Sequence, residues 1–199
     1  AAGEVATGMH GADRIGGNML AACIIFGKLA GTSAARWSNT YQNKRNSIQS
    51  IDRMTETWGF SANRKGSTSP HECLRLLQDK AWEHALVIRS QKGLSEFKNT
   101  IDQLHNLLTF EVDTSTPQNL IKALELRNLL LVGEAIAIAC DYRKESRGGH
   151  YREDFPQQST SQPEACVIQY DDEKLHMRTE VIDPNWSEKD TDLGNQRWG

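Results

Sequence analysis

The chain has 199 residues, and its 23 basic and 26 acidic residues give a formal net charge of −3. Because the two signs are interspersed, this composition excludes an electropositive footprint for nucleic acid or for an anionic membrane surface. The longest apolar runs, MLAACIIFG and LLLVGEAIAIAC, contain Gly or Glu and fall short of the roughly 20 residues that span a bilayer. We therefore expect no direct membrane span and no nucleic-acid partner.

The first predicted elements are a strand end at residues 1–3, a glycine-rich loop at 4–17 and a helix from about Asn18 to Ala35. Apolar and small residues recur in that last stretch at helical spacing, and Asn18 is a suitable N-cap. The chain opens without Met and without a signal-peptide pattern. We interpret it as the downstream piece of a longer polypeptide.

Residues 38–69 are polar and rich in Ser, Asn and basic side chains around a short helical pattern, IDRMTETWGF. Such composition is typical of a linker between domains. We therefore place a domain boundary near residue 38.

Three helices are predicted next. The first begins at Pro70, the second follows Gly93, and the third runs from about 117 to 145 after a start signal at Ser115 or Thr116. Apolar stripes at period 3.6 predict that they pack together, and short connections predict an antiparallel bundle. The stripes are Cys73, Leu74, Leu77, Trp82, Ala85 and Leu86 in the first helix, and Leu94, Phe97, Ile101, Leu104, Leu107 and Leu108 in the second. The third helix is apolar nearly all round, so it should be central.

Two alternating runs close the chain, ACVIQYD and KLHMRTEVI, and they predict a β-hairpin. The fold class is thus mainly α, with a small C-terminal hairpin. The predicted division is 1–37 as a closing strand end, loop and helix of an α/β domain, 38–69 as linker, 70–156 as helical bundle, and 157–199 as hairpin and tail.

The four cysteines are scattered, with no CxxC pair. We expect free, reduced thiols rather than a disulfide framework. The segment ESRGGHYREDFP groups His150, Glu153 and Asp154, but nothing completes a metal coordination set. We favour a glycine-terminated helix end followed by a charged docking loop, and we predict no metal site.

The opening stretch EVATGMHGADRIGGNML has the parts of an anion site. Arg14 offers a planar charged fork for a carboxylate, and the pair Gly16-Gly17 lets a flat ligand approach the backbone. The start of the following helix supplies N–H groups and a positive dipole end. Spacing alone favours equally a tight turn with Arg14 in a surface ion pair.

Two motifs resemble one family. AAGEVATGMHGADRIGGNMLAACIIFGKLAG is similar to the segment that closes the FAD-binding domain in fumarate reductase and succinate dehydrogenase flavoprotein subunits, and ALELRNLLLVGEAIAIACDYRKESRGGHYREDFP resembles their C-terminal helical domain. L-aspartate oxidase and adenylylsulfate reductase share parts of this plan. The resemblance covers most of the chain, with both motifs in the family's order.

The resemblance implies the roles of the site residues. Arg14 corresponds to the catalytic Arg that binds a substrate carboxylate, and Glu4 to a residue that contacts FAD. The backbone N–H groups of Met19 and Leu20 would face the flavin ring, while His10 and Asn18 would support the loop. Two positions depart from the pattern: Asp13 replaces the usual Asn, and Met19 replaces Ser or Ala. The Asp leaves the identity of the substrate open.

By the same resemblance, the chain would be part of an FAD-dependent enzyme of electron transport that moves hydride between flavin and a dicarboxylate such as fumarate or succinate. The family's glycine-fingerprint strand-turn-helix and capping domain are absent, so FAD would be bound mainly by that missing part and this chain alone would be inactive. An iron-sulfur subunit would be the electron partner. We expect a cytoplasmic protein, attached to the membrane's cytoplasmic face only through a partner.

Two alternatives remain open. The chain could be a structural docking module for an iron-sulfur partner, without a flavin of its own. It could also belong to an enzyme of the L-aspartate oxidase or adenylylsulfate reductase type.

Overall fold

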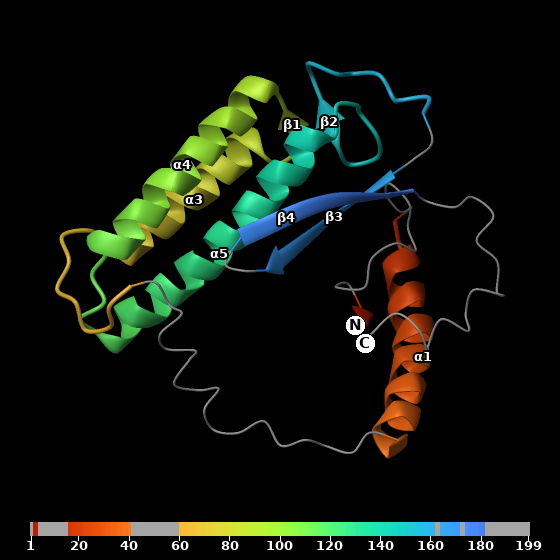
Figure 1. Cartoon of the computed structure of the whole chain (residues 1–199), viewed down its shortest axis with the longest axis horizontal. Helices are drawn as coiled ribbons and strands as arrows, with labels where there is room; N and C mark the ends of the chain where they lie inside the picture. The colour runs from red at the N-terminus through yellow and green to blue at the C-terminus, as the bar shows by residue number, and fades with distance from the viewer. Residues whose placement is uncertain (1, 4–15, 41–59, 162–163, 172–173, 182–199) are drawn as a thin grey trace.

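A computed structural model describes residues 2–3, 16–40, 60–161, 164–171 and 174–181. These residues form helices and short strands in the order α1 (Asn18–Thr40), α3 (Pro70–His84), β1 (Ile88–Arg89), α4 (Gln91–Phe110), α5 (Pro117–Tyr142), β2 (Tyr151–Arg152), β3 (Glu164–Asp171) and β4 (Lys174–Val181). The chain is therefore mainly helical, as the sequence predicts (Figure 1).

Side-chain caps set where two helices of the bundle begin. The Ser90 hydroxyl accepts a hydrogen bond from the Gly93 amide at the start of α4, and the Thr116 hydroxyl accepts one from the Asn119 amide at the start of α5. Each cap satisfies an amide that has no partner within its helix. The predicted start signal at Thr116 is confirmed, whereas α4 begins two residues before Gly93 rather than after it.

Contacts at the helix ends show that α4 runs antiparallel to α3 and that α5 runs antiparallel to α4. A bridge between Thr68 and Val112 places the start of α3 beside the end of α4. The Gln91 side-chain amide donates to Asp141 at 2.7 Å, which places the start of α4 beside the end of α5. The three helix axes run alongside one another in Figure 1. The predicted antiparallel bundle is therefore present.

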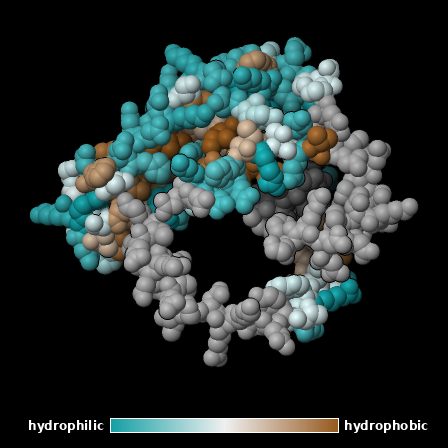
Figure 2. Space-filling model, viewed as in Figure 1, coloured by the Kyte–Doolittle hydropathy of each residue, from teal (hydrophilic) through white to brown (hydrophobic). Residues whose placement is uncertain are grey.

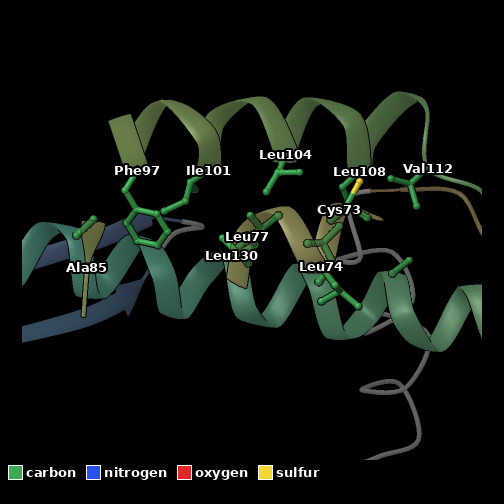
Figure 3. Close-up of a cluster of buried hydrophobic side chains, with 13 residues drawn as sticks. Cys73, Leu74, Leu77, Ala85, Phe97, Ile101, Leu104, Leu108, Val112 and Leu130 are labelled. Atoms are coloured by element: carbon green, nitrogen blue, oxygen red, sulfur yellow. The ribbon is translucent and has the colours of Figure 1, made fainter. Parts of the chain in front are cut away.

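One stripe on α4 supplies much of the core. Phe97, Ile101, Leu104 and Leu108 are each at most 3% exposed, and Figure 3 shows them pointing from α4 toward the side chains of α3 and α5. The remaining members of this core include Cys73, Leu74 and Leu77 from α3, and Ala123, Leu126, Leu130 and Ala137 from α5. Burying one such large side chain contributes about 1.5–3 kcal/mol.

Some residues that we expected in the core lie at the surface. Trp82 is 76% exposed and Leu86 is 44% exposed, because the core face of this segment continues beyond Leu77 through Ala81 and Ala85 instead. On α5, Val132 is 51% exposed, so only one face of this helix packs into the core. The third helix also ends at Tyr142, three residues before the predicted end.

Residues 60–69, which we expected to belong to a linker, pack on the bundle. The Arg64 guanidinium donates to the Val112 carbonyl at 2.8–3.0 Å and to the Leu108 carbonyl at 2.8 Å. Phe60 packs against the hydrophobic core. Arg64 thus satisfies carbonyls at the end of α4 that have no partner within the helix. The domain boundaries themselves stay predictions.

Two small sheets accompany the helices. The predicted hairpin is confirmed: β3 and β4 pair antiparallel, with Glu164 opposite Val181 and Asp171 opposite Lys174. A second sheet, which the sequence did not indicate, pairs β1 with β2 in parallel. Its strands have two residues each, too few to show an alternating pattern. This pair joins the α3–α4 connection to the segment that follows α5.

Helix α1 lies apart from the bundle in Figure 1 and contains no buried residue. It extends to Thr40, past the boundary that we expected at residue 37. Leu20, Ile24 and Leu29 are each more than half exposed. Hydrophilic side chains dominate the visible surface of the bundle, with smaller hydrophobic patches between them (Figure 2).

Our expectation that no segment is long enough to cross a membrane needs correction. Within the described ranges, α1 is long and apolar enough by length and composition alone, because the apolar run continues through Gly27 and Lys28 as one helix. The indication is weak, since core helices and signal sequences pass the same test.

Two smaller expectations have different outcomes. Ala2 and Gly3, expected at a strand end, are not in a strand, and Gly3 has φ of 74°, which a β-strand does not allow. All four cysteines are free, as predicted.

Candidate functional site

The glycine-rich loop leads directly into α1. Gly17 has φ of 89°, a backbone conformation that favours glycine. Asn18 is the first residue of the helix, so the N-cap position falls on Gly17 and not, as predicted, on Asn18. A Cβ placed on Gly16 or Gly17 would meet nothing within 4 Å. The backbone at this helix start is therefore open to a flat or bulky ligand.

The first turn of α1 presents the residues that we expected to face a flavin. Asn18 and Leu20 are exposed and Met19 is half-buried. The Leu20 amide donates to the Gly17 carbonyl at 3.3 Å, so it is engaged in the helix's own first turn. Helix starts carry a partial positive charge from their amides, which favours an anionic ligand.

The other predicted site residues, Glu4, His10 and Arg14, lie outside the described residues. Whether the Arg14 guanidinium turns toward the start of α1 stays a prediction. Of the predicted site residues, the described part of the chain includes Asn18, Met19 and Leu20, which follow one another in the first turn of α1.

A second polar cluster follows α5 and is built around Glu145, which is 6% exposed. Its carboxylate accepts hydrogen bonds from Arg143 at 2.7 Å, from Arg147 at 3.0–3.2 Å and from the Ser159 amide at 2.8 Å. These donors, Arg147 foremost, lower the pKa of Glu145 to about 2. One carboxylate thus holds both guanidinium groups and the chain that leads toward β3.

Arg152 forms the other half of this region and is fully buried. Its guanidinium donates two parallel hydrogen bonds to Asp154, at 2.8 and 2.7 Å, and a third to the Cys140 carbonyl at 2.7 Å. The Asp154 carboxylate also accepts from the Gln91 amide at 2.9 Å. Hydrogen bonding to Arg152 lowers the pKa of Asp154 to about 2. The pair therefore ties the end of α5 to the start of α4.

Our interpretation of this segment as a glycine-terminated helix end is wrong. The helix ends at Tyr142, and Gly148, with φ of 56°, lies in a later turn. That turn is closed by reciprocal backbone hydrogen bonds between Arg147 and His150. Within the described segments no group of three or more His, Cys, Asp or Glu side chains could hold a metal.

Sequence reasoning singled out this segment but not the roles of its residues. The alternation of acidic and basic side chains in ESRGGHYREDFP was the available signal. Arg147 and Asp154 are partners within this segment, but the further partners, the Ser159 amide, the Cys140 carbonyl and Gln91, lie outside it, so pattern alone does not identify the whole cluster. Both carboxylates, Glu145 and Asp154, are held in structural contacts with arginines, which favours a structural role for this cluster over a catalytic one.

The described residues thus define a mainly helical module, with an antiparallel bundle, a charge-paired loop and two small sheets. The profile of the family described as "Fumarate reductase flavoprotein C-term" matches residues 75–195. A fumarate reductase (CoM/CoB) protein of Methanothermobacter marburgensis is 37% identical over 163 residues, 79% of this chain and 29% of that protein. An L-aspartate oxidase of Acinetobacter baylyi is 32% identical over 158 residues, 76% of this chain and 26% of that protein.

A solved structure agrees with these relatives. The apo form of the Sdh1 complex of Mycobacterium smegmatis has a TM-score of 0.77 and 26% identity, over 94% of this chain and 33% of that one. The chain belongs to the fumarate reductase flavoprotein C-terminal family, as its two motifs predict. It spans under a third of the length of the curated relatives that it matches.

Proposed function

We propose that this chain is the C-terminal part of an FAD-dependent oxidoreductase of the fumarate reductase and succinate dehydrogenase type, with a dicarboxylate as substrate. The observation that carries the proposal is the family match over residues 75–195, together with the open helix start at Asn18. The chain's short share of its relatives means that the activity would belong to a longer polypeptide.

The start of α1 fits the cofactor that the family implies. Gly16 and Gly17 leave room beside the backbone, and the helix start favours the negative edge of a ring or an acid. When bound, FAD supplies the acceptor and donor of hydride. The amides of Met19 and Leu20 would orient the ring edge, with Leu20 giving up its 3.3 Å bond to Gly17.

The remaining residues would bind and orient. Arg14 would hold a substrate carboxylate through two parallel hydrogen bonds, Glu4 would accept hydrogen bonds from FAD, and His10 and Asn18 would fix the shape of the loop. Most of the FAD contacts would come from the part of the polypeptide outside this chain. An iron-sulfur subunit would supply electrons, on the cytoplasmic face of a membrane.

Two alternatives have some support. A docking module without its own flavin is favoured by an apolar cavity of about 170 Å³ between α3 and α5, lined by residues that include Leu86, Leu129 and Val132. An activity of the L-aspartate oxidase type is favoured by the relative that is 32% identical.

Substitution of Arg14 in the longer polypeptide tests the proposal. We expect Arg14→Ala to lower kcat/KM for fumarate reduction by 10²-fold or more, because a charged bidentate contact of about 3 kcal/mol is lost. FAD content, measured by visible absorbance, should stay at the wild-type level. Arg14→Lys should recover only part of the activity, since Lys keeps the charge without the planar fork.

Arg36→Ala provides the matched control, because Arg36 is an exposed arginine on α1, far along the helix from its start. It should leave both activity and flavin unchanged. Wild-type activity in Arg14→Ala would remove Arg14 from the site. If the wild-type polypeptide carries FAD but oxidises L-aspartate in preference to reducing fumarate, the second enzyme class is correct instead.

A further inference from the structure

A polar pocket of about 250 Å³ lies where α5 ends and the chain continues toward β3. Its lining combines the Glu145 cluster with residues of the segment before β3. Drug-sized ligands occupy pockets of about 300–1,000 Å³, so this one fits a smaller molecule. The residues that line it are Tyr142, Arg143, Lys144, Glu145, Arg147, Ser159, Ser161 and Glu164.

Positive charge exceeds negative charge in this pocket. Three cations line it, Arg143, Lys144 and Arg147. Two carboxylates, Glu145 and Glu164, oppose them, which leaves one net positive charge. Glu145 stays ionised because its pKa is about 2, and it pairs with both arginines. Lys144 is exposed and has no ion pair within the described ranges, so the pocket favours an anion.

Arg147 is held in place and still has a donor to offer. It donates from Nε and Nη2 to the Glu145 carboxylate, and from Nη2 to the Ser159 carbonyl. A guanidinium has five N–H donors, and the Nη1 of Arg147 makes no hydrogen bond to any residue that the structure describes. Because Glu145 already fixes the guanidinium, binding a ligand costs little further side-chain entropy.

A pair of hydroxyl groups supplies another donor. The Oγ atoms of Ser159 and Ser161 lie 2.6 Å apart, and the Ser161 amide donates to the Ser159 Oγ at 3.2 Å. One hydroxyl proton is enough for the bond between the two oxygens. The other proton is therefore left for a ligand.

The end of α5 carries the negative end of the helix dipole, which opposes an anion. Donors already engage two carbonyls there. The Cys140 carbonyl accepts from Arg152 at 2.7 Å, and the Arg143 carbonyl oxygen lies 3.1 Å from the His150 Nε2. The repulsion from this helix end is therefore reduced.

We propose that this pocket binds a phosphate group, as inorganic phosphate or as the phosphate of a small monoester. Its donors belong to three separate groups, the Arg147 guanidinium, the Lys144 ammonium and the serine hydroxyl pair. A phosphate presents three strong acceptor oxygens, whereas a carboxylate presents two. The bound group would connect the end of α5 to the segment before β3. This binding depends neither on a flavin nor on Arg14.

Isothermal titration calorimetry of the whole chain tests the inference with three probes: inorganic phosphate, glycerol 3-phosphate and succinate. Chloride keeps the ionic strength constant, and a pH of about 7.5 keeps a monoester mostly dianionic. We expect one saturable site for phosphate and at least tenfold weaker binding of succinate. Tighter binding of the ester or of the free ion identifies the source of the phosphate group. No saturation up to about 10 mM phosphate, a concentration well above a millimolar Kd, would overturn the proposal, as would equal binding of succinate.

Lys144→Gln tests the site without disturbing the contacts of Glu145. It should weaken phosphate binding by about tenfold, because it removes a charged donor. Lys65→Gln is the matched control: Lys65 is exposed and lies before α3, at the end of the bundle opposite the end of α5. It should bind phosphate like the wild type. Equal weakening in the two variants would show general charge attraction instead of a site, and would overturn the proposal.

Hydrogen exchange locates the bound phosphate. The Ser159 amide, which donates to Glu145 at 2.8 Å, and the Ser161 amide should exchange more slowly at saturating phosphate. The amides of α3 should exchange at the same rate with and without it. A uniform change over the chain, or protection confined to another segment, would place the anion elsewhere and overturn the assignment to this pocket.

Discussion

At the scale of single residues, Arg152 shows how a buried charge is tolerated in this fold. Its side chain is 0% exposed, and removing a charge from water is costly unless it is paired and hydrogen-bonded. Asp154 and the Cys140 carbonyl meet that requirement, and the Phe155 ring lies 5.1 Å from the guanidinium carbon. The guanidinium group therefore has partners both in its plane and over its face.

Arg152→Met should destabilise the chain by about 2–4 kcal/mol, because the Cys140 carbonyl loses its guanidinium donor and the Asp154 carboxylate keeps only the Gln91 backbone amide in place of its charged partner. The value lies at the lower end for a buried pair, since the Asp154 side chain is 28% exposed and water can solvate it. Urea unfolding followed by circular dichroism measures the difference. The stability of Arg152→Lys should lie between that of the wild type and that of Arg152→Met, because Lys restores the charge but not the planar guanidinium group. A loss below about 0.5 kcal/mol in Arg152→Met would contradict this account.

At the scale of elements, the segment before α3 is held by close backbone packing. A Cβ on Gly66 would overlap the Glu111 carbonyl oxygen and the Asp113 amide nitrogen, which are backbone atoms just beyond the end of α4. Backbone atoms cannot rotate away as a flexible side chain can. Gly66 is therefore required by the close approach of two chain segments.

Gly66→Ala should lower stability by about 1–3 kcal/mol, the usual cost of overpacking, and should detach residues 60–69 from the end of α4. The unfolding midpoint of the bundle and the hydrogen-exchange protection of the Thr114 amide, which donates to the Arg64 carbonyl, both report on it. Gly31→Ala on α1 is the control, because its Cβ would meet nothing within 4 Å. An unchanged midpoint in Gly66→Ala would show that the contact is not needed.

The elements also show which parts of the fold a sequence reveals. The stripe from Leu94 to Leu108 and the cap at Thr116 depend on neighbours within a few positions, and both were predicted correctly. The hydrogen bond from Arg64 to the Val112 carbonyl joins residues 48 positions apart. The strands β1 and β2 likewise pair although α4 and α5 lie between them in the sequence. Such contacts leave no local pattern, so the end of the linker and the second sheet were missed.

The candidate site was predicted from a different kind of information. The glycines and the helix start at Asn18 follow from local chemistry, whereas the roles of Glu4, His10 and Arg14 came from resemblance to a family. The family is confirmed over residues 75–195, which do not include that loop. The roles themselves stay predictions until the substitutions are made.

At the scale of the whole molecule, the bundle and α1 differ in how they are stabilised. The bundle buries its own apolar side chains, while α1 leaves Leu20, Ile24 and Leu29 at the surface. An apolar helix without a buried face gains little from packing, and isolated helices are marginal in water. The chain spans 29% of the fumarate reductase protein that it matches. In the proposed enzyme, α1 would gain its packing from the rest of the polypeptide.

We therefore expect these 199 residues alone to purify without tightly bound flavin. A helix start contributes about 0.3–1 kcal/mol toward an anion, and one guanidinium contact adds about 1.5–3 kcal/mol. Micromolar affinity needs about 8 kcal/mol, so the two together fall short. Visible absorbance after incubation with FAD and gel filtration measures retention, with the longer polypeptide as the positive control. Retention of flavin by the short chain at equal stoichiometry would mean that the loop and α1 form a complete binding site, and that the division of the site between two parts of the polypeptide is wrong.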